Sequence, residues 1–202
     1  MNLKSSIEKG KKQFAGIELP GRTLGVIGLG SIGVNVANAA LALGMKVIGF
    51  DPKVTVTNAW KLSSGVEKVD DLDAIFKRSD AVTVHVPLVE QTKNLINSEC
   101  LNLLRKNSIL INFSRGGVVN TTDVLTALNE NLLSSFVCDF PEPALIKHQK
   151  VIALPHLGAS TMEAEQNCAV MVANNLIDYI ENGNINYSVN FPTAVMNRVN
   201  GY

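Results

Sequence analysis

The segment Gly28-Leu-Gly-Ser-Ile-Gly33 places three glycines at fixed spacing between two apolar stretches. The run Thr23–Ile27 before it is typical of a buried strand, and Val34–Leu43 after it is typical of a helix that stops at Gly44. In this context the first glycine permits a tight turn, the second lets a pyrophosphate approach the backbone, and the third lets helix and strand pack closely. The free N–H groups of the helix N-terminus then attract phosphate. We therefore expect a dinucleotide-binding unit rather than a glycine turn that only joins two elements.

An acidic residue follows the next apolar run. Asp51, in Asp51-Pro52, comes directly after Lys46–Phe50 and about twenty residues beyond the glycine loop. A carboxylate at this place accepts hydrogen bonds from the adenosine ribose and repels a 2′-phosphate. NAD is therefore expected in preference to NADP.

Short apolar runs and helical patterns alternate along the rest of the chain. Expected strands cover Ala81–Val86, Ser108–Asn112, Ser135–Asp139 and Val151–Ala153. Expected helices cover Asp70–Lys77, Ser98–Leu104 with Ser98 as N-cap, a segment from Thr121 or Thr122 to Asn129, and Thr161–Glu181 with Thr161 as N-cap and Gly183 past its end. The alternation predicts an α/β fold, a Rossmann-type doubly wound parallel sheet with helices on both faces.

Composition narrows the class of function. The chain has 202 residues, 46% of them hydrophobic, and its 18 Lys+Arg balance 18 Asp+Glu, so no basic excess favours a nucleic-acid partner. No apolar stretch reaches the roughly 20 residues of a membrane span, and the N-terminus lacks the apolar core of a secretory signal. Cys100, Cys138 and Cys168 are widely spaced, so neither a metal site nor a disulfide framework is indicated and the cytoplasm is the expected compartment.

Several ordered motifs together resemble one family. They are Gly25–Gly33, Gly44–Pro52, Val82–Leu88, Asn112–Val119 and Leu154–Thr161. In this order they resemble the D-isomer-specific 2-hydroxyacid dehydrogenases. The segments Phe14–Leu19, Pro155–Thr161 and Val189–Pro192 are most similar to the branch of that family that oxidises D-3-phosphoglycerate.

The resemblance implies a domain plan. In this family the nucleotide-binding domain is inserted in the chain of a substrate-binding domain, and the active site lies in the cleft between them. We expect a connecting helix or lead-in over 1–18, the NAD-binding domain over 19–182 with its long C-terminal helix 161–182, and a tail or linker over 183–202. Substrate-binding and regulatory domains are expected to lie outside this chain, which would then be a piece of a longer protein. A homodimer formed through the NAD-binding domain is also expected.

Three residues match the family's catalytic positions. His156 would be the general acid/base, since imidazole titrates near neutral pH. Arg115 would bind the substrate carboxylate with two hydrogen bonds. Glu142 would hydrogen-bond His156 and raise its basicity, although the chain has lost residues from the loop after Asp139 that relatives carry. The structural alternatives are a hydrogen-bonded structural residue for His156, a surface arginine beside a glycine turn for Arg115 and a turn carboxylate flanked by prolines for Glu142.

The resemblance also implies the cofactor contacts. Ser31 stands where many relatives carry an arginine, so one charged contact to the pyrophosphate is lost. His85 is interpreted as a structural residue because its neighbours are apolar. The expected cofactor-binding residues are Gly28, Gly30, Ser31, Ile32, Gly33, Asp51, Pro52, Val86, Pro87, Phe113, Ser114, Arg115, Asp139, His156, Gly158 and Ala159.

The implied function is NAD-dependent oxidation of D-3-phosphoglycerate to 3-phosphohydroxypyruvate, the first step of serine biosynthesis. The expected partners are NAD, a small 2-hydroxy or 2-oxo acid and a second copy of this chain. One alternative is another D-2-hydroxyacid dehydrogenase acting on glycerate, lactate or glyoxylate. A second alternative is an NAD-sensing regulatory protein on the same fold. Alone, these 202 residues are expected to bind NAD weakly and to turn over little, because the opposite wall of the cleft is missing.

Overall fold

The computed structural model describes residues 7, 10, 11 and 16–191, so most of the expected lead-in over 1–18 and the end of the expected tail lie outside the described residues. The chain divides into two compact units, residues 1–155 and 156–202. The expected domain over 19–182 spans parts of both. Each unit is described by itself.

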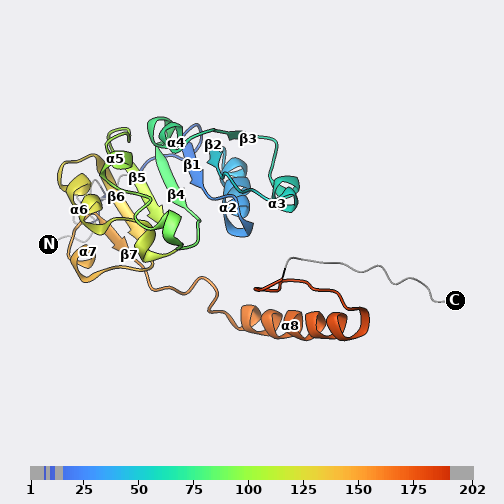
Figure 1. The fold of residues 1–202 in the computed structure, drawn as a ribbon. Helices are drawn as coiled ribbons and strands as arrows, with labels where there is room; N and C mark the ends of the chain where they lie inside the picture. Colours follow the sequence, from blue (N-terminus) through green and yellow to red (C-terminus); the bar gives the residue numbers. More distant parts are fainter. Residues whose placement is uncertain (1–6, 8–9, 12–15, 192–202) are drawn as a thin grey trace. The chain divides into compact units, whose positions relative to one another are not determined.

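The first unit contains a parallel sheet of seven strands in the order β3-β2-β1-β4-β5-β6-β7 (Figure 1). The strands are β1 (Thr23–Ile27), β2 (Lys46–Phe50), β3 (Val66–Lys68), β4 (Ala81–Val84), β5 (Ser108–Asn112), β6 (Leu133–Cys138) and β7 (Val151–Ala153). Strand order reverses between β1 and β4, and ligands of doubly wound sheets bind outside the carboxyl ends of the strands at such a point. The expected Rossmann-type fold is confirmed.

Helices connect these strands in the first unit. They are α2 (Ser31–Ala42), α3 (Val56–Lys61), α4 (Leu72–Arg78), α5 (Ser98–Leu101), α6 (Thr121–Asn129) and α7 (Pro143–Ile146), with 3-10 turns η2 (Glu90–Thr92) and η3 (Gly116–Val118). The very short elements α3, β3 and α7 were not expected from the sequence. The bounds of two strands also differ from expectation: β4 ends at Val84 rather than Val86, and β6 covers Leu133–Cys138 rather than Ser135–Asp139.

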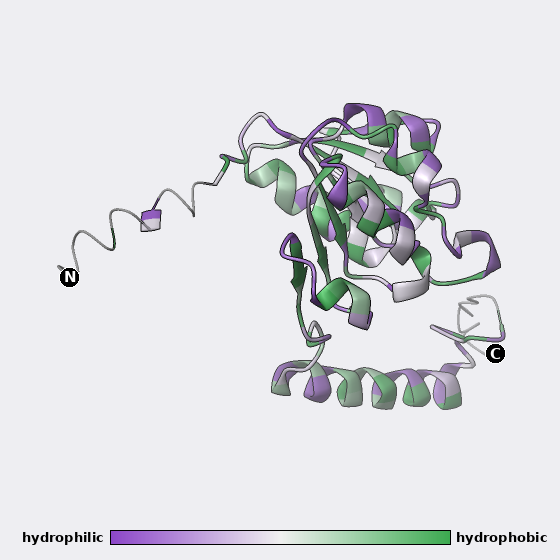
Figure 2. Cartoon of the chain, turned by 90° about the vertical axis from the view of Figure 1, so that its left-hand side faces the viewer, coloured by the Kyte–Doolittle hydropathy of each residue, from purple (hydrophilic) through white to green (hydrophobic). Residues whose placement is uncertain are grey.

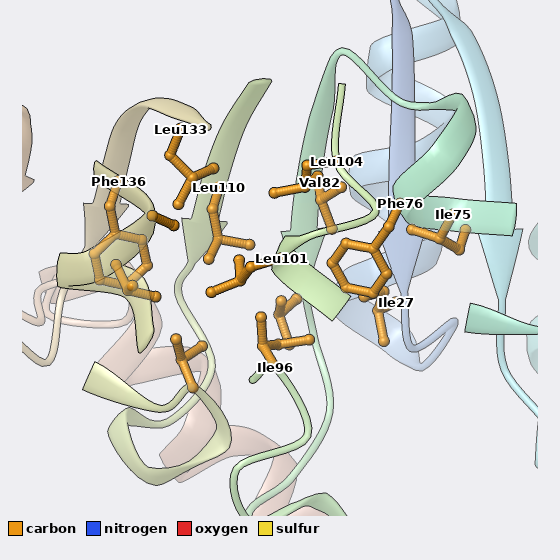
Figure 3. Close-up of a cluster of buried hydrophobic side chains, with 14 of the residues drawn as sticks. Ile27, Ile75, Phe76, Val82, Ile96, Leu101, Leu104, Leu110, Leu133 and Phe136 are labelled. Carbon is orange, nitrogen blue, oxygen red and sulfur yellow. The ribbon is translucent and has the colours of Figure 1, made fainter. Parts of the chain in front are cut away.

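Helices lie on both faces of the sheet. Side chains alternate between the faces of a strand, so neighbouring residues of β1 belong to different parts of the core. Val26 packs in one cluster with Val34 of α2, whereas Ile27 packs in the larger cluster with Phe76 of α4. Figure 3 shows the larger cluster, in which Val82, Leu110 and Phe136 of the sheet meet Leu101 of α5. Burial of these side chains fixes the strands whose ends carry the site.

Two predicted helix N-caps are wrong by one or two residues. The N-cap of α5 is Asn97, whose Oδ1 accepts from the backbone N–H groups of Glu99 and Cys100, and not Ser98. The N-cap of α6 is Asn120, not Thr121 or Thr122. An asparagine precedes the expected Ser or Thr in both cases, and its side chain caps a helix as well as theirs does. The helix α5 also ends at Leu101, before the expected Leu104.

The second unit contains the helix α8 (Met162–Asn182). Thr161 is its N-cap, with Oγ1 accepting from the Ala164 N–H at 3.1 Å, and Gly183 ends it in the left-handed conformation, as expected. Apolar and polar residues alternate around this helix (Figure 2). Within the described residues, no helix is long and apolar enough to cross a membrane.

Candidate active site

The carboxyl ends of six strands lie in one row. Pairing in register joins Phe50 to Ile27, Ile27 to Val84, Val84 to Asn112, Asn112 to Cys138, and Cys138 to Ala153. The chain therefore leaves all six strands along the same edge of the sheet. The segments that follow begin at Gly28, Asp51, His85, Phe113, Asp139 and Leu154. This register brings the expected cofactor and substrate residues of the first unit to one edge.

The glycine loop after β1 has no room for side chains at two positions. Gly28 has φ +92°, and a Cβ there would lie 2.7 Å from the carbonyl oxygen of His85. A Cβ on Gly33 would collide with the carbonyl oxygen of Gly28. Gly30 differs, because a Cβ there would meet nothing within 4 Å. Two of the glycines are thus required by packing, and the third borders open space.

The open space beside Gly30 lies at the N-terminus of α2. Gly30 is the N-cap of this helix, and its carbonyl accepts from the Val34 N–H at 3.0 Å. The N–H groups of Ser31, Ile32 and Gly33 precede the first intrahelical donor, so they have no partner within the helix. They carry the partial positive charge of the helix N-terminus. The loop therefore fits a pyrophosphate that lies against the backbone.

Asp51 is held in place by two backbone groups. Its Oδ2 accepts from the Leu29 N–H and its Oδ1 accepts from the Lys53 N–H, both at 2.8 Å. Each carboxylate oxygen can accept a further hydrogen bond. The carboxylate is therefore fixed and still able to accept from two ribose hydroxyls.

A cavity of about 510 Å3 opens between the glycine loop and the segment after β4. Six expected residues line it, namely Gly28, Gly30, Asp51, Pro52, Val86 and Pro87. Nine further residues line it that were not assigned to the cofactor from the sequence: Ile27, Phe50, Lys53, Leu72, His85, Val89, Gln91, Thr92 and Leu95. Mostly apolar walls with a carboxylate at the rim suit a flat base attached to a ribose.

The wall after β4 is a turn built on Thr92. Its Oγ1 donates to the Pro87 carbonyl at 2.5 Å and accepts from the Val89 N–H at 2.9 Å. Proline interrupts a strand, and threonine hydroxyls bond to nearby backbone groups, so both residue types favour a turn here. That signal in the sequence marks the turn, but it does not show that the turn faces a ligand.

His85 lines the cavity and also bonds within the sheet. Its Nε2 lies 2.9 Å from Thr83 Oγ1, and burial lowers the pKa of the imidazole below its ordinary value of 6.5. The bond to Thr83 fits the structural role expected from the sequence. Its place in the cavity wall adds a surface that the cofactor can contact.

The loop after β5 is organised by Asn112, which is buried. Its Oδ1 accepts from the Ser114 N–H at 3.0 Å and from Ser114 Oγ at 2.7 Å, and its Nδ2 donates to the Arg115 carbonyl at 2.9 Å. Arg115 itself is exposed, and its Nη1 donates to the Ser114 carbonyl at 2.7 Å. The loop therefore presents a fixed cation at the carboxyl edge. No role was assigned to Asn112 from the sequence, although a polar residue at the end of a buried strand is a signal of this kind.

The loop after β6 carries Asp139 and Glu142. Asp139 comes directly after the strand, at the same edge as Arg115. Glu142 is the exposed N-cap residue of α7; its backbone carbonyl accepts from the Leu145 N–H at 2.9 Å, and its side chain makes no capping hydrogen bond. Its carboxylate is therefore not used by the helix.

The other expected residues lie in the second unit. His156 is its first residue, and Gly158 and Ala159 follow before α8. The structure thus gathers Arg115 and the first-unit cofactor residues at one edge of the sheet. The pairing of Glu142 with His156 stays a prediction.

Comparison with known proteins agrees with this geometry. Residues 2–158 match the family model described as D-isomer specific 2-hydroxyacid dehydrogenase, NAD binding domain. The chain is 42% identical over 178 residues to the D-3-phosphoglycerate dehydrogenase of Methanocaldococcus jannaschii, covering 84% of this chain and 34% of that protein. It is 36% identical to the enzyme of the same name from Bacillus subtilis, covering 93% and 36%. The chain thus spans about a third of the length of these relatives.

Solved structures of the family have the same fold. The apo form of D-mandelate dehydrogenase from Rhodotorula graminis matches with a TM-score of 0.81 and 25% identity, over 96% of this chain and 57% of that one. D-lactate dehydrogenase from Aquifex aeolicus, solved with NAD and lactic acid, matches with a TM-score of 0.71 and 27% identity, over 87% and 61%. The glycine loop, the open space at Gly30 and the fixed Asp51 fit NAD, which is the cofactor of the matched domain. The chain belongs to the D-isomer specific 2-hydroxyacid dehydrogenase family and carries its NAD-binding domain.

Proposed function

We propose that the protein oxidises D-3-phosphoglycerate to 3-phosphohydroxypyruvate with NAD, the first step of serine biosynthesis. The observation that carries the proposal is the shared carboxyl edge, where the glycine loop, Asp51 and Arg115 follow strands that end in register. The choice of substrate is supported by relatives named D-3-phosphoglycerate dehydrogenase at 36–42% identity. Those relatives carry further sequence outside the matched third.

Residues of this chain would bind the cofactor, bind the substrate and transfer the proton. Bound NAD would supply the hydride acceptor. The glycine loop and Asp51 would hold its pyrophosphate and adenosine ribose. Arg115 would bind the substrate carboxylate and stay charged throughout. His156 would take the proton of the hydroxyl group, and Glu142 would accept a hydrogen bond from the imidazole and so stabilise its charged form.

The test is a substrate panel with the complete protein. D-3-phosphoglycerate, D-glycerate and D-lactate, each offered with NAD and with NADP, are compared by kcat/KM. The proposal expects the highest value for D-3-phosphoglycerate with NAD. A higher value for D-lactate or D-glycerate would assign the protein to another branch of the family, to which the D-mandelate and D-lactate dehydrogenase structures belong. NADH binding without turnover of any substrate would favour an NAD-sensing protein.

We further propose a cytoplasmic homodimer formed through this domain, and weak NADH binding with little turnover by residues 1–202 alone. Cys100, Cys138 and Cys168 all carry free thiols, which suits a reducing compartment. Sedimentation of the complete protein tests the dimer, and a monomer at micromolar concentration would contradict it. Steady-state activity of residues 1–202 close to that of the complete protein would contradict the second expectation.

A further inference from the structure

An aromatic ring lies over the exposed cation of the candidate site. The guanidinium carbon of Arg115 is 5.6 Å from the centroid of the Phe140 ring. This distance lies within the range of about 6 Å at which a guanidinium is attracted to the negative face of an aromatic ring. Arg115 follows β5 and Phe140 follows β6, and these strands pair in register through Asn112 and Cys138. The contact is therefore made between two neighbouring loops at the carboxyl edge.

The ring and the backbone together fix the guanidinium. Nη1 donates to the Ser114 carbonyl at 2.7 Å, and Asn112 holds the backbone of the same loop. Within the described part of the chain, Nε and Nη2 of Arg115 have no hydrogen-bond partner. These two atoms lie on one edge of the planar group and match the two oxygens of a carboxylate. A guanidinium with one face covered by a ring and Nη1 engaged leaves this edge for the ligand.

The loop that carries Phe140 is short and stiff. Phe140 directly follows Asp139, the first residue of the loop, and is itself followed by Pro141 and Pro143 on either side of Glu142. A Cβ placed on Gly116 would lie 3.5 Å from the Cβ of Phe140, so the base of the ring packs over the residue next to Arg115. The aromatic residue of this loop therefore packs against the loop that carries Arg115.

We infer that Phe140 is a positioning residue that acts through Arg115 and sets the orientation in which its guanidinium meets the substrate carboxylate. The inference rests on the proposed function, in which Arg115 binds that carboxylate. A ring that only filled space would be replaceable by any apolar side chain of similar size. A ring that positions the cation is replaceable only by another aromatic ring.

The test compares Phe140→Leu with Phe140→Tyr in the complete protein. Leucine keeps an apolar side chain but has no negative face, whereas tyrosine keeps the ring. We expect Phe140→Leu to raise the KM for the hydroxy acid about 5- to 20-fold, with kcat within about 2-fold. Phe140→Tyr should stay within about 2-fold of the wild type in both constants. The dissociation constant of NADH should change less than the KM for the hydroxy acid, because neither Phe140 nor Arg115 lines the cavity beside the glycine loop.

A second measurement is independent of turnover. The Nε–H resonance of Arg115 in a 15N-labelled protein should be shifted by the ring current, and Phe140→Leu should abolish the shift while Phe140→Tyr keeps it. A wild-type KM in Phe140→Leu would overturn the inference. An equal rise in KM in the leucine and tyrosine variants would overturn it too. If Phe140→Leu unfolds, the inference is tested by the KM of Phe140→Trp and by the ring-current shift in the wild type. A wild type without that shift overturns the inference. A wild type that shows the shift but oxidises no 2-hydroxy acid overturns the proposed function instead, and the inference with it.

Discussion

The backbone N–H of Leu29 donates to Oδ2 of Asp51 at 2.8 Å, across 22 residues of sequence. This bond joins the glycine loop after β1 to the end of β2. Asp51 therefore has two roles near the point where the strand order of the sheet reverses. It presents a negative charge to the ribose, and it holds the loop that meets the pyrophosphate.

Replacing Asp51 by asparagine should weaken NADH binding and reduce the preference for NADH over NADPH. The carboxylate accepts from the N–H groups of Leu29 and Lys53 through different oxygens, each at 2.8 Å, whereas an amide would place its own NH2 group against one of these two donors. Hydrogen bonds to charged groups contribute about 1.5–3 kcal/mol, which corresponds to roughly a 10- to 100-fold rise in the NADH dissociation constant. NADPH binding should suffer less, because the charge that repels its 2′-phosphate is gone. Fluorescence titration with both cofactors measures the two constants.

The matched control is Asp70→Asn. This substitution removes the same charge from Asp70, an exposed residue that pairs with Lys68. Asp70 does not line the cavity beside the glycine loop. It should leave both dissociation constants unchanged. An unchanged ratio of NADH to NADPH affinity in Asp51→Asn would mean that Asp51 does not distinguish the free ribose hydroxyl of NADH from the 2′-phosphate of NADPH.

Two glycines of the same loop should respond differently to alanine. Gly33→Ala places a Cβ against the Gly28 carbonyl, so the backbone must shift and we expect a loss of stability of about 1–3 kcal/mol together with loss of NADH binding. Gly30→Ala meets no protein atom within 4 Å and should cost at most about 1 kcal/mol as a changed N-cap. Its Cβ enters the space meant for the pyrophosphate, so NADH binding should still fall.

Urea denaturation and NADH titration of both variants separate the two effects. The expected pattern is a stable Gly30→Ala protein that binds poorly and an unstable Gly33→Ala protein. Full NADH affinity in Gly30→Ala would show that the cofactor does not approach the loop at this place.

The sequence was sufficient to predict the parts of the fold that local patterns determine. The glycine loop, Asp51 at a strand end and the caps of α8 at Thr161 and Gly183 each depend on a few neighbouring residues. The strand β3 and the helix α3 were missed because 3 and 6 residues are too few to show a period. The caps Asn97 and Asn120 were missed because a competing Ser or Thr follows each of them.

Much of the cavity wall was beyond sequence reasoning for a different reason. Phe50 ends β2 and Thr92 follows β4, two strands that are not consecutive in the chain, and only the strand order brings them to the same cavity. The contact between Arg115 and Phe140 likewise depends on the pairing of β5 with β6. A pattern of neighbouring residues contains no information about which loops become neighbours in space.

His85 should make stability depend on pH below neutrality. Burial lowers the pKa of its imidazole in the folded protein below the ordinary value of 6.5. When the pH falls below about 6.5, the unfolded chain takes up a proton at this residue before the folded chain does, so stability is lost from there down to the folded pKa. His85→Gln removes this contribution. Between pH 7.5 and 5.5 the thermal midpoint of the wild type should fall further than that of His85→Gln, by about 2–4 °C for each kcal/mol involved.

The control for His85 is His148→Gln, which alters a histidine in the loop after α7 that does not line the cavity. Its midpoint should follow the wild type across the same pH range. Parallel curves for the wild type and His85→Gln would show that this residue does not couple to folding.

His156 and Glu142 should act as one catalytic unit. Loss of a general acid/base costs about 10²- to 10⁴-fold in rate, so His156→Gln should lower kcat by that order. Glu142 is exposed and its side chain makes no capping hydrogen bond, so Glu142→Gln removes no part of the helix α7 and should lower kcat less. If Glu142 acts only through His156, the double variant should be no slower than His156→Gln alone.

Glu130→Gln, an exposed change at the end of α6, serves as the control and should leave kcat unchanged. Independent, multiplicative losses in the double variant would separate the two residues and leave Glu142 a turn carboxylate between prolines.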